Sequence, residues 1–223
     1  MRRFRPTWVE VDLAAVRHNV RLLKPDRVEL LAVVKADGYG HGDAPVARAA
    51  LEAAASRIGV ALVEEGLGLR EHGIEAPILV LSEFPAGAEK EALAAGLTPT
   101  VYTPDGLERL AAASDDAVAV HLKLDTGMHR VGLWPPEEAP AFARRILEAG
   151  LRLEGLWTHF AASEADEAGT RDQLAKLLAA RDAMTGDGIE PAMLHAANSA
   201  ATILYPDTHL DLVRPGAAIY GID

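Results

Sequence analysis

Residues 30–42 read Leu30-Leu31-Ala32-Val33-Val34-Lys35-Ala36-Asp37-Gly38-Tyr39-Gly40-His41-Gly42, which is an apolar run, a lysine and a turn-forming segment. The five apolar residues predict a buried strand, and the glycines after Lys35 predict a turn at its end. An amine held at the mouth of an apolar strand can lose its proton more easily than a surface lysine, and a neutral amine can form a Schiff base with an aldehyde. The segment therefore points to an aldehyde cofactor anchored on Lys35. A solvated lysine at a strand end is the ordinary alternative.

Short apolar runs alternate with longer alanine- and leucine-rich amphipathic segments along the whole chain, a pattern typical of βα units around a parallel sheet. Strands are predicted over residues 29–35, 58–62, 77–81, 98–102, 118–124, 152–158, 193–196 and 210–214. Helices are predicted over residues 13–23, 44–55, 64–71, 88–95, 104–113, 136–149 and 167–184. Gly73, Gly96 and Gly150 follow three of these helices and suit their C-termini. Eight parallel strands with outer helices close into a barrel, so we expect an α/β fold of the (β/α)8 TIM-barrel class.

Composition supports one soluble domain over residues 1–223, since no linker or low-complexity stretch divides the chain. Apolar residues make up 49% and charged residues 25%, as in an ordinary globular protein, and no stretch has the length and purity of a membrane-spanning helix. The net charge of −11 argues against a nucleic-acid-binding surface. We therefore expect neither nucleic acid nor membrane as a partner.

Two further expectations concern location and metals. The basic N-terminus, residues 1–6, is followed by acidic residues where a signal peptide would need an apolar core, so we expect a cytoplasmic protein. The chain has no cysteine, which excludes disulfides and thiolate-ligated metals. His41, His121 and His195 show no metal-binding spacing, and metal catalysis is not indicated.

Residues that could react with or bind a ligand follow the predicted strands. Barrel enzymes build their active sites at the C-terminal ends of their strands. These residues are Lys35 and Tyr39 after the first strand, Arg130 after the fifth, His159 at the sixth, Asn198 and Ser199 after the seventh, and Arg214 and Gly216 after the eighth. The loops after the last two strands often hold phosphate. Ser199 offers a hydroxyl at a helix N-cap, and Gly216 lets the backbone approach closely. In the alternative, Ser199 only caps a helix and Gly216 only turns the chain.

The octet Lys35-Ala36-Asp37-Gly38-Tyr39-Gly40-His41-Gly42 closely resembles the pyridoxal-phosphate lysine motif of the alanine racemase family. The segment Lys123-Leu124-Asp125-Thr126-Gly127-Met128-His129-Arg130 is similar to a second block of that family, with His129 where the family often has glycine. Thr158-His159-Phe160-Ala161 is similar to a third. The resemblance extends across the chain and covers the family's N-terminal barrel.

The resemblance implies a role for each candidate residue. Lys35 would carry pyridoxal 5'-phosphate, Arg130 would contact the cofactor phenolic oxygen and the substrate carboxylate, and Lys123 matches a position where family members can carry a carbamylated lysine. The remaining implied cofactor contacts are Tyr39, Ser199, Gly216 and Ala217 at the phosphate, Arg214 at the pyridine nitrogen, and Leu81, His159 and Asn198 around them.

Several of these residues also have ordinary structural interpretations. Arg214 could instead pair with Asp207 or Asp211, His159 could bridge backbone groups, Leu81 could belong to the core, and Lys123 could form a salt bridge within the barrel.

The activity that the resemblance implies is the interconversion of L-alanine and D-alanine, used for cell-wall peptidoglycan. Family enzymes are homodimers that use two bases, the cofactor lysine and a tyrosine from the partner's C-terminal β domain. The printed chain ends at Asp223, where that domain would begin, so we expect a fragment that binds the cofactor but racemises poorly. The alternatives are a single-domain pyridoxal-phosphate carrier or homeostasis protein without racemase activity and, on fold analogy alone, a barrel isomerase without this cofactor.

Overall fold

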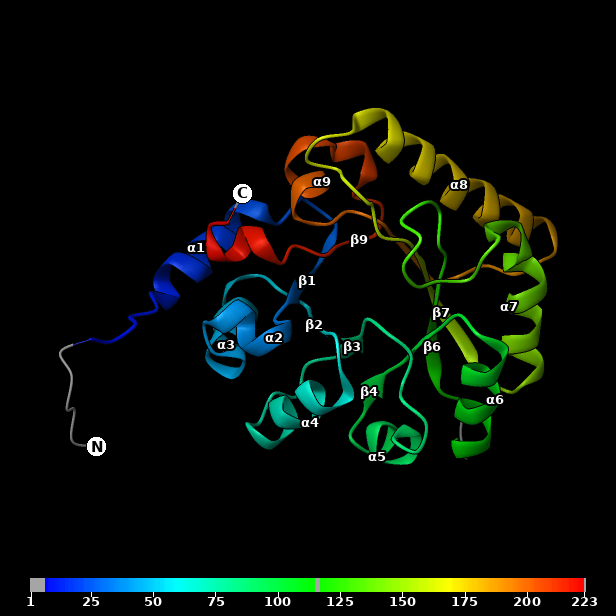
Figure 1. Ribbon diagram of the computed structural model, residues 1–223, viewed down its shortest axis with the longest axis horizontal. Helices are drawn as coiled ribbons and strands as arrows, with labels where there is room; N and C mark the ends of the chain where they lie inside the picture. The colour runs from blue at the N-terminus through cyan, green and yellow to red at the C-terminus, as the bar shows by residue number, and fades with distance from the viewer. Residues whose placement is uncertain (1–6, 115–116, 223) are drawn as a thin grey trace.

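Parallel strands form a barrel with helices around it in the computed structural model, which describes residues 7–114 and 117–222 (Figure 1). The basic residues 1–6, on which the expectation of a cytoplasmic protein rests, lie outside these ranges. The strands are β1 (Glu29–Val33), β2 (Arg57–Val60), β3 (Ile78–Val80), β4 (Leu97–Thr98), β5 (Thr100–Val101), β6 (Ala119–Lys123), β7 (Arg152–Trp157), β8 (Met193–His195) and β9 (Leu212–Val213). The helices are α1 (Leu13–Leu23), α2 (Lys35–Gly40), α3 (Asp43–Ala53), α4 (Val63–Glu71), α5 (Glu89–Ala94), α6 (Pro104–Ala113), α7 (Ala139–Glu148), α8 (Glu167–Gly186) and α9 (Ser199–Leu204), with short 3-10 turns η1 (Pro136–Glu138), η2 (Pro206–Thr208) and η3 (Ala217–Tyr220).

The barrel closes through two junctions between its hydrogen-bonded sheets, which have the orders β4-β3-β2-β1-β9 and β5-β6-β7-β8. At the first junction, Pro99 separates β4 from β5, because proline has no N–H to give to a ladder. The carbonyl of Pro99 still accepts the N–H of His121 at 3.0 Å. At the second junction, the N–H of Asp211 donates to Leu194 O at 3.1 Å and the N–H of Arg214 donates to Ala197 O at 2.9 Å. The predicted (β/α)8 TIM barrel is therefore confirmed.

All eight predicted strands are present, but some predicted ends are wrong. The first strand stops at Val33 rather than residue 35, because Lys35 already belongs to the turn α2. The predicted helix over 136–149 begins as the 3-10 turn η1 and becomes α-helical only at Ala139. Gly73, Gly96 and Gly150 have φ between +65° and +78°, as expected of helix C-termini.

Alternation along the strands divides the core into two parts. Leu30, Ala32, Ile58 and Val60 belong to the large core cluster that the strands share with the helices, while Leu31, Leu79, Met193 and Leu212 form a separate buried apolar cluster with Val33. A β-bulge interrupts this alternation in β7, where Leu153 pairs with Val120 and Gly155 pairs with His121. None of the helices in the described ranges is long and apolar enough to cross a membrane.

The two ends of the barrel sequence meet beside the first strand. Figure 1 shows the C-terminal turn η3, in red, next to the blue helix α1. Asn19 Nδ2 in α1 donates to Ile219 O at 3.2 Å, and the hydroxyl of Tyr220 donates to Val33 O at 3.2 Å. The turn η3 is thus hydrogen-bonded to the end of β1, the strand that leads to Lys35.

Candidate active site

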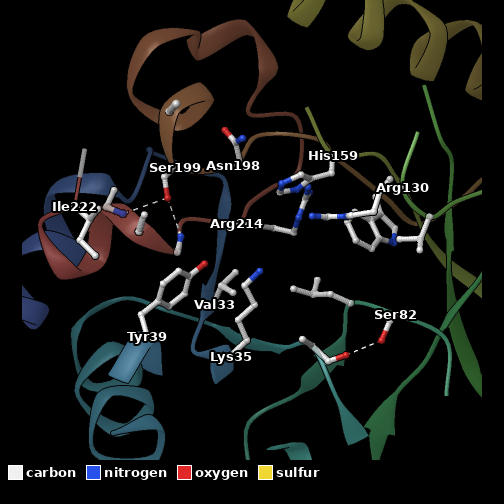
Figure 2. Close-up of a pocket in the computed structure, with 18 of the residues that line it drawn as sticks. Val33, Lys35, Tyr39, Ser82, Arg130, His159, Asn198, Ser199, Arg214 and Ile222 are labelled. Carbon is white, nitrogen blue, oxygen red and sulfur yellow. Dashed lines mark hydrogen bonds between the residues drawn. The ribbon is translucent and has the colours of Figure 1, made fainter. Parts of the chain in front are cut away.

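A cavity of about 690 Å³ opens at the C-terminal ends of the barrel strands (Figure 2). All of the candidate residues predicted from the sequence line it, namely Lys35, Tyr39, Leu81, Lys123, Arg130, His159, Asn198, Ser199, Arg214, Gly216 and Ala217. Figure 2 shows Lys35 reaching towards the middle of this space, with Tyr39 on one side and Arg130 on the other. The structure therefore brings the predicted residues together at one face of the barrel.

The segment after Lys35 is a single left-handed turn. Ala36, Asp37 and Tyr39 have φ of 52–53°, a backbone conformation that costs a residue with a side chain roughly 1–2 kcal/mol. Its far end is closed by Asp37, whose carbonyl accepts the N–H of Gly42 at 2.9 Å and whose Oδ1 accepts the N–H of Asp43 at 3.1 Å. The turn predicted from the glycines is present, but with three of its left-handed positions occupied by other residues.

Tyr39 and Gly216 meet at the wall of the cavity. A Cβ on Gly216 would lie 2.6 Å from Tyr39 Oη, so a larger residue at this position would force the tyrosine ring to shift. Burial raises the pKa of Tyr39, which keeps its hydroxyl protonated near neutral pH. Tyr220, which the sequence reading did not single out, packs against Tyr39 with ring centroids 5.0 Å apart.

The hydroxyl of Ser199 joins the two loops at which phosphate was expected. Its Oγ accepts the N–H of Gly216 at 2.9 Å and that of Ala218 at 3.2 Å, which leaves the O–H free to donate (Figure 2). The prediction that Ser199 is an N-cap is wrong. Helix α9 begins at Ser199, and Asn198 is the N-cap, with its Oδ1 accepting the N–H of Ala201 at 3.0 Å.

Arg214 is buried, 3% exposed, and is held by three acceptors. Its Nη1 lies 2.8 Å from Nδ1 of His195, and its Nη2 donates to Thr158 O at 2.7 Å and to Ala196 O at 3.0 Å. A guanidinium has five N–H groups, so Nε–H and one Nη1–H have no acceptor among the described residues and are available to a ligand. Burial lowers the pKa of Arg214 to about 9, and the group stays protonated near neutral pH.

The alternative pairing of Arg214 with an aspartate is wrong. Asp211 Oδ2 accepts the N–H of Leu194 at 2.7 Å, and Asp207 binds Arg171 at 2.6 Å. Both carboxylates are therefore engaged away from the cavity.

Behind Arg214 lies a buried pair of histidines that the sequence reading left unassigned. Arginine has no acceptor, so Nδ1 of His195 must accept and the proton of His195 must sit on Nε2. That Nε2 lies 2.8 Å from Nδ1 of His121, which must accept in turn and carry its own proton on Nε2. His121 Nε2 is buried and has no partner among the described residues. Burial, with the charges of Arg57 and Arg214, lowers the pKa of His121 to about 3, and burial with Arg214 lowers that of His195 well below its usual range.

Lys123 is 2% exposed and its Nζ lies 4.7 Å from the ring centroid of Trp157. The alternative of a salt bridge is wrong, since no carboxylate of the described residues lies within 4.0 Å of this amine. Burial, together with the charges of Arg130 and Arg214, lowers the pKa of Lys123 to about 7. A large fraction of this amine is therefore neutral near neutral pH.

His159 and Leu81 complete the lining. Burial, with the charges of Arg214 and Lys123, lowers the pKa of His159 well below its usual range, so the ring is neutral. Only the backbone carbonyl of His159 has a hydrogen bond within the described ranges, from Gln173 at 3.2 Å, so its ring does not bridge backbone groups. Leu81 packs against the inner apolar cluster as well as lining the cavity. No group of three or more metal-binding side chains occurs among residues 7–114 and 117–222.

Comparison with known proteins identifies the family. The model of "Alanine racemase, N-terminal domain" matches residues 11–223. The alanine racemase of Symbiobacterium thermophilum is 46% identical over 98% of this chain and 59% of its own length, and alanine racemase 1 of Oceanobacillus iheyensis is 42% identical over 98% and 60%. The crystal structure of alanine racemase from Bacillus anthracis with bound L-Ala-P has a TM-score of 0.90 and 36% identity, and it covers 100% of this chain and 60% of that chain.

The chain thus spans about three fifths of the length of the curated relatives it matches. With its barrel fold and this match over nearly all of its residues, the chain belongs to the alanine racemase family, as the N-terminal domain.

Proposed function

We propose that this barrel binds pyridoxal 5'-phosphate and attaches it covalently to Lys35. Pyridoxal phosphate supplies an aldehyde that condenses with amines and a ring that withdraws electrons from the carbon beside the nitrogen. Lys35 is the partly exposed lysine at the first strand end, and its Nζ lies 5.9 Å from the ring centroid of Tyr39 within the cavity. The amine would add to the aldehyde carbon, and the carbonyl oxygen would leave as water.

The donors around the cavity fit the two ends of this cofactor. At the phosphate end, Ser199 keeps an O–H to donate after accepting two N–H groups, and Tyr39 remains a protonated donor. Gly216, where a Cβ would strike Tyr39, gives an anion access to the backbone. At the other end, Arg214 has two N–H groups without an acceptor in residues 7–114 and 117–222, and they suit a ring nitrogen that accepts a hydrogen bond.

Arg214 also bears on the kind of reaction. It is held by three acceptors and is protonated near neutral pH, so it has no site at which to accept a proton. A ring nitrogen facing this guanidinium would stay unprotonated and would withdraw electrons more weakly. A ring that withdraws electrons weakly favours the return of the proton to the same carbon over transamination.

The proposed reaction is the interconversion of L-alanine and D-alanine, with Lys35 as one of two bases. Arg130 is exposed at the cavity, and its planar guanidinium suits a two-pronged contact with a carboxylate. The relative from Bacillus anthracis was solved with L-Ala-P, which supports a small amino acid as the ligand. The observation that carries this proposal is the convergence of Lys35, Arg130 and Arg214 on one cavity.

The proposal also includes a homodimer. In it, the C-terminal β domain of the partner subunit supplies a tyrosine as the second base. A proton removed on one face and returned on the other needs a base on each face. We expect the printed chain by itself to bind the cofactor and to racemise alanine poorly.

We propose separately that Lys123 is carbamylated. Carbon dioxide reacts with the neutral form of an amine, and the lowered pKa of Lys123 provides that form. The carbamate would place a negative charge near Arg130, which would hold that guanidinium in position for the substrate carboxylate. Mass spectrometry of the intact protein in bicarbonate and in carbon-dioxide-free buffer tests this proposal.

The racemase proposal is tested by supplying the barrel with the C-terminal region of a family member and measuring D-alanine formed from L-alanine. We expect D-alanine only when both parts and pyridoxal phosphate are present. Cofactor binding without any D-alanine would contradict the racemase function and favour a carrier of pyridoxal phosphate. A preparation that takes up no pyridoxal phosphate would contradict both.

A further inference from the structure

Glu65, in the first turn of helix α4, joins two of the loops that form the cavity. Its Oε1 accepts the N–H of Ala36 at 2.6 Å, and its Oε2 accepts the N–H groups of Ala61 at 2.7 Å and Leu62 at 3.1 Å. Ala36 follows β1, whereas Ala61 and Leu62 follow β2 and line the cavity. One carboxylate therefore fixes two adjacent strand ends.

The contact with Ala36 acts on Lys35 through the backbone. The N–H of Ala36 belongs to the peptide bond that joins Lys35 to Ala36, and a peptide unit is planar. A hydrogen bond to this N–H fixes the orientation of that plane, and with it the ψ angle of Lys35. The backbone from which the Lys35 side chain extends is thereby set on its C-terminal side by Glu65.

The left-handed turn needs such a constraint at its near end. Ala36 and Asp37 both have φ of 52°, which disfavours the turn for residues that have side chains. The far end is closed by the contacts of Asp37 with Gly42 and Asp43, while Glu65 holds the N–H of Ala36. Loss of Glu65 would release the peptide beside Lys35 first.

We propose that Glu65 is a positioning residue for Lys35, which holds the amine where the aldehyde of the cofactor arrives. This inference rests on the proposed attachment of pyridoxal phosphate to Lys35. The ordinary structural role of Glu65 is to cap helix α4, since its bond to the N–H of Leu62 is half of a capping box. The cap alone involves neither Ala36 nor Lys35, so the two roles can be separated.

The test compares Glu65→Gln with Glu64→Gln in the purified chain. Glutamine keeps one acceptor oxygen but points an NH2 group at N–H donors, so it cannot hold all three contacts. Glu64 is exposed in the same helical turn, and its carboxylate has no hydrogen bond or ion pair within residues 7–114 and 117–222, which makes it a matched control.

Two probes separate positioning from folding. Pyridoxal phosphate is mixed with each protein and quenched with borohydride at timed intervals, and the adduct on the Lys35 peptide is measured by mass spectrometry. The affinity for 4'-deoxypyridoxine 5'-phosphate, which has no aldehyde, is measured in parallel. We expect Glu65→Gln to slow adduct formation about tenfold or more with unchanged affinity for the analogue, because misplacement of a reacting group acts on the rate. Glu64→Gln should match the parent protein in both.

Other results would overturn the inference. An adduct rate equal to that of the parent, or an analogue affinity that falls in proportion to the rate, contradicts a positioning role. If Glu65→Gln does not fold, Glu65→Asp keeps the charge but shortens the reach, and the same two probes apply. Hydrogen exchange at the Ala36 amide needs no cofactor, and exchange that is not faster in the variant also refutes the proposal. A parent protein with no adduct at Lys35 refutes the proposed function instead.

Discussion

Lys123 shows how strongly the barrel interior acts on a single charge. Its pKa falls from an ordinary value of 10.5 to about 7, chiefly through burial. Between these two pH values the unfolded chain binds a proton that the folded chain does not, so this group makes the free energy of unfolding rise with pH. Below pH 7 both states bind the proton, and the folded protein bears the full cost of the buried charge.

We predict that Lys123→Met stabilises the fold, by on the order of 4 kcal/mol at pH 6.5 and by much less at pH 9.5. Methionine fills similar space without a charge that must be buried. Urea unfolding in carbon-dioxide-free buffer at the two pH values measures the difference. A gain of the same size at both pH values would show that the effect comes from packing and not from the proton.

The histidines behind Arg214 give a second prediction for single residues. Both should remain neutral with the proton on Nε2 from pH 5.5 to 8.5, because Arg214 can only donate and the pKa values of both rings are lowered. Nitrogen-15 NMR of the imidazole rings distinguishes this tautomer from the Nδ1–H form. A ring that titrates in this range, or an Nδ1–H signal from His195, would contradict the donor chain described above.

Sequence motifs were sufficient to gather the residues of the cavity but not to describe their contacts. Lys35, Arg130 and Arg214 stand out because each follows a strand in a recognisable block. The contact between His195 and Arg214 joins positions 19 residues apart on neighbouring strands, and it depends on the way the barrel closes. Residues two apart on a strand point to the same face of the sheet. This rule alone could have placed His121 beside Lys123 in β6, and Gly155 beside Trp157 in β7, on the inner face of the barrel.

Among the elements, β7 is the strand that departs most from a regular pattern. Glu154 is the extra residue of its bulge, and its Oε1 binds Arg57 Nη1 of β2 at 2.9 Å. Arg57 Nε also binds Glu29 of β1 at 3.0 Å. One guanidinium thus links three strands at the N-terminal ends of the barrel. The positive charge of Arg57 also helps to lower the pKa of His121, which keeps that ring neutral.

We predict that Arg57→Leu destabilises the barrel by about 2 kcal/mol, because it leaves carboxylates partly buried without their partner. The Arg57 and Glu154 side chains are 17% and 15% exposed. Arg144→Leu is the control, since the side chains of Arg144 and Asp187 are 52% and 38% exposed, and its cost should stay below about 1 kcal/mol. Equal losses in urea unfolding would mean that the three-strand link contributes no more than a surface pair.

The elements that a sequence pattern could not predict are the irregular ones. Apolar periodicity identifies the strands and the long helices, because it reflects which side is buried. The bulge at Glu154 and the left-handed backbone at Ala36 are instead held by contacts with Arg57 and Glu65, which come from distant parts of the chain. For the same reason, the interruption of the fourth strand at Pro99 was visible in the sequence but its effect on pairing was not.

At the scale of the whole molecule, the barrel should gain stability from its proposed cofactor. A ligand that binds only the folded state at 100 times its Kd adds about 2.7 kcal/mol, which raises the Tm of a domain of this size by roughly 5–10 °C. Pyridoxal without phosphate should raise Tm less, because it has no group for the loops of Ser199 and Gly216. Equal shifts in thermal unfolding with the two compounds would contradict the assigned phosphate site.

The attachment of pyridoxal phosphate to Lys35 is the central claim, and one measurement tests it directly. The purified chain is incubated with pyridoxal phosphate, reduced with borohydride, digested and analysed by mass spectrometry, with Lys35→Ala beside it. We predict a reduced adduct on the peptide that contains Lys35, and none in the variant. An adduct on Lys24, Lys90, Lys123 or Lys176 in its place, or no adduct in the parent chain, would contradict the account.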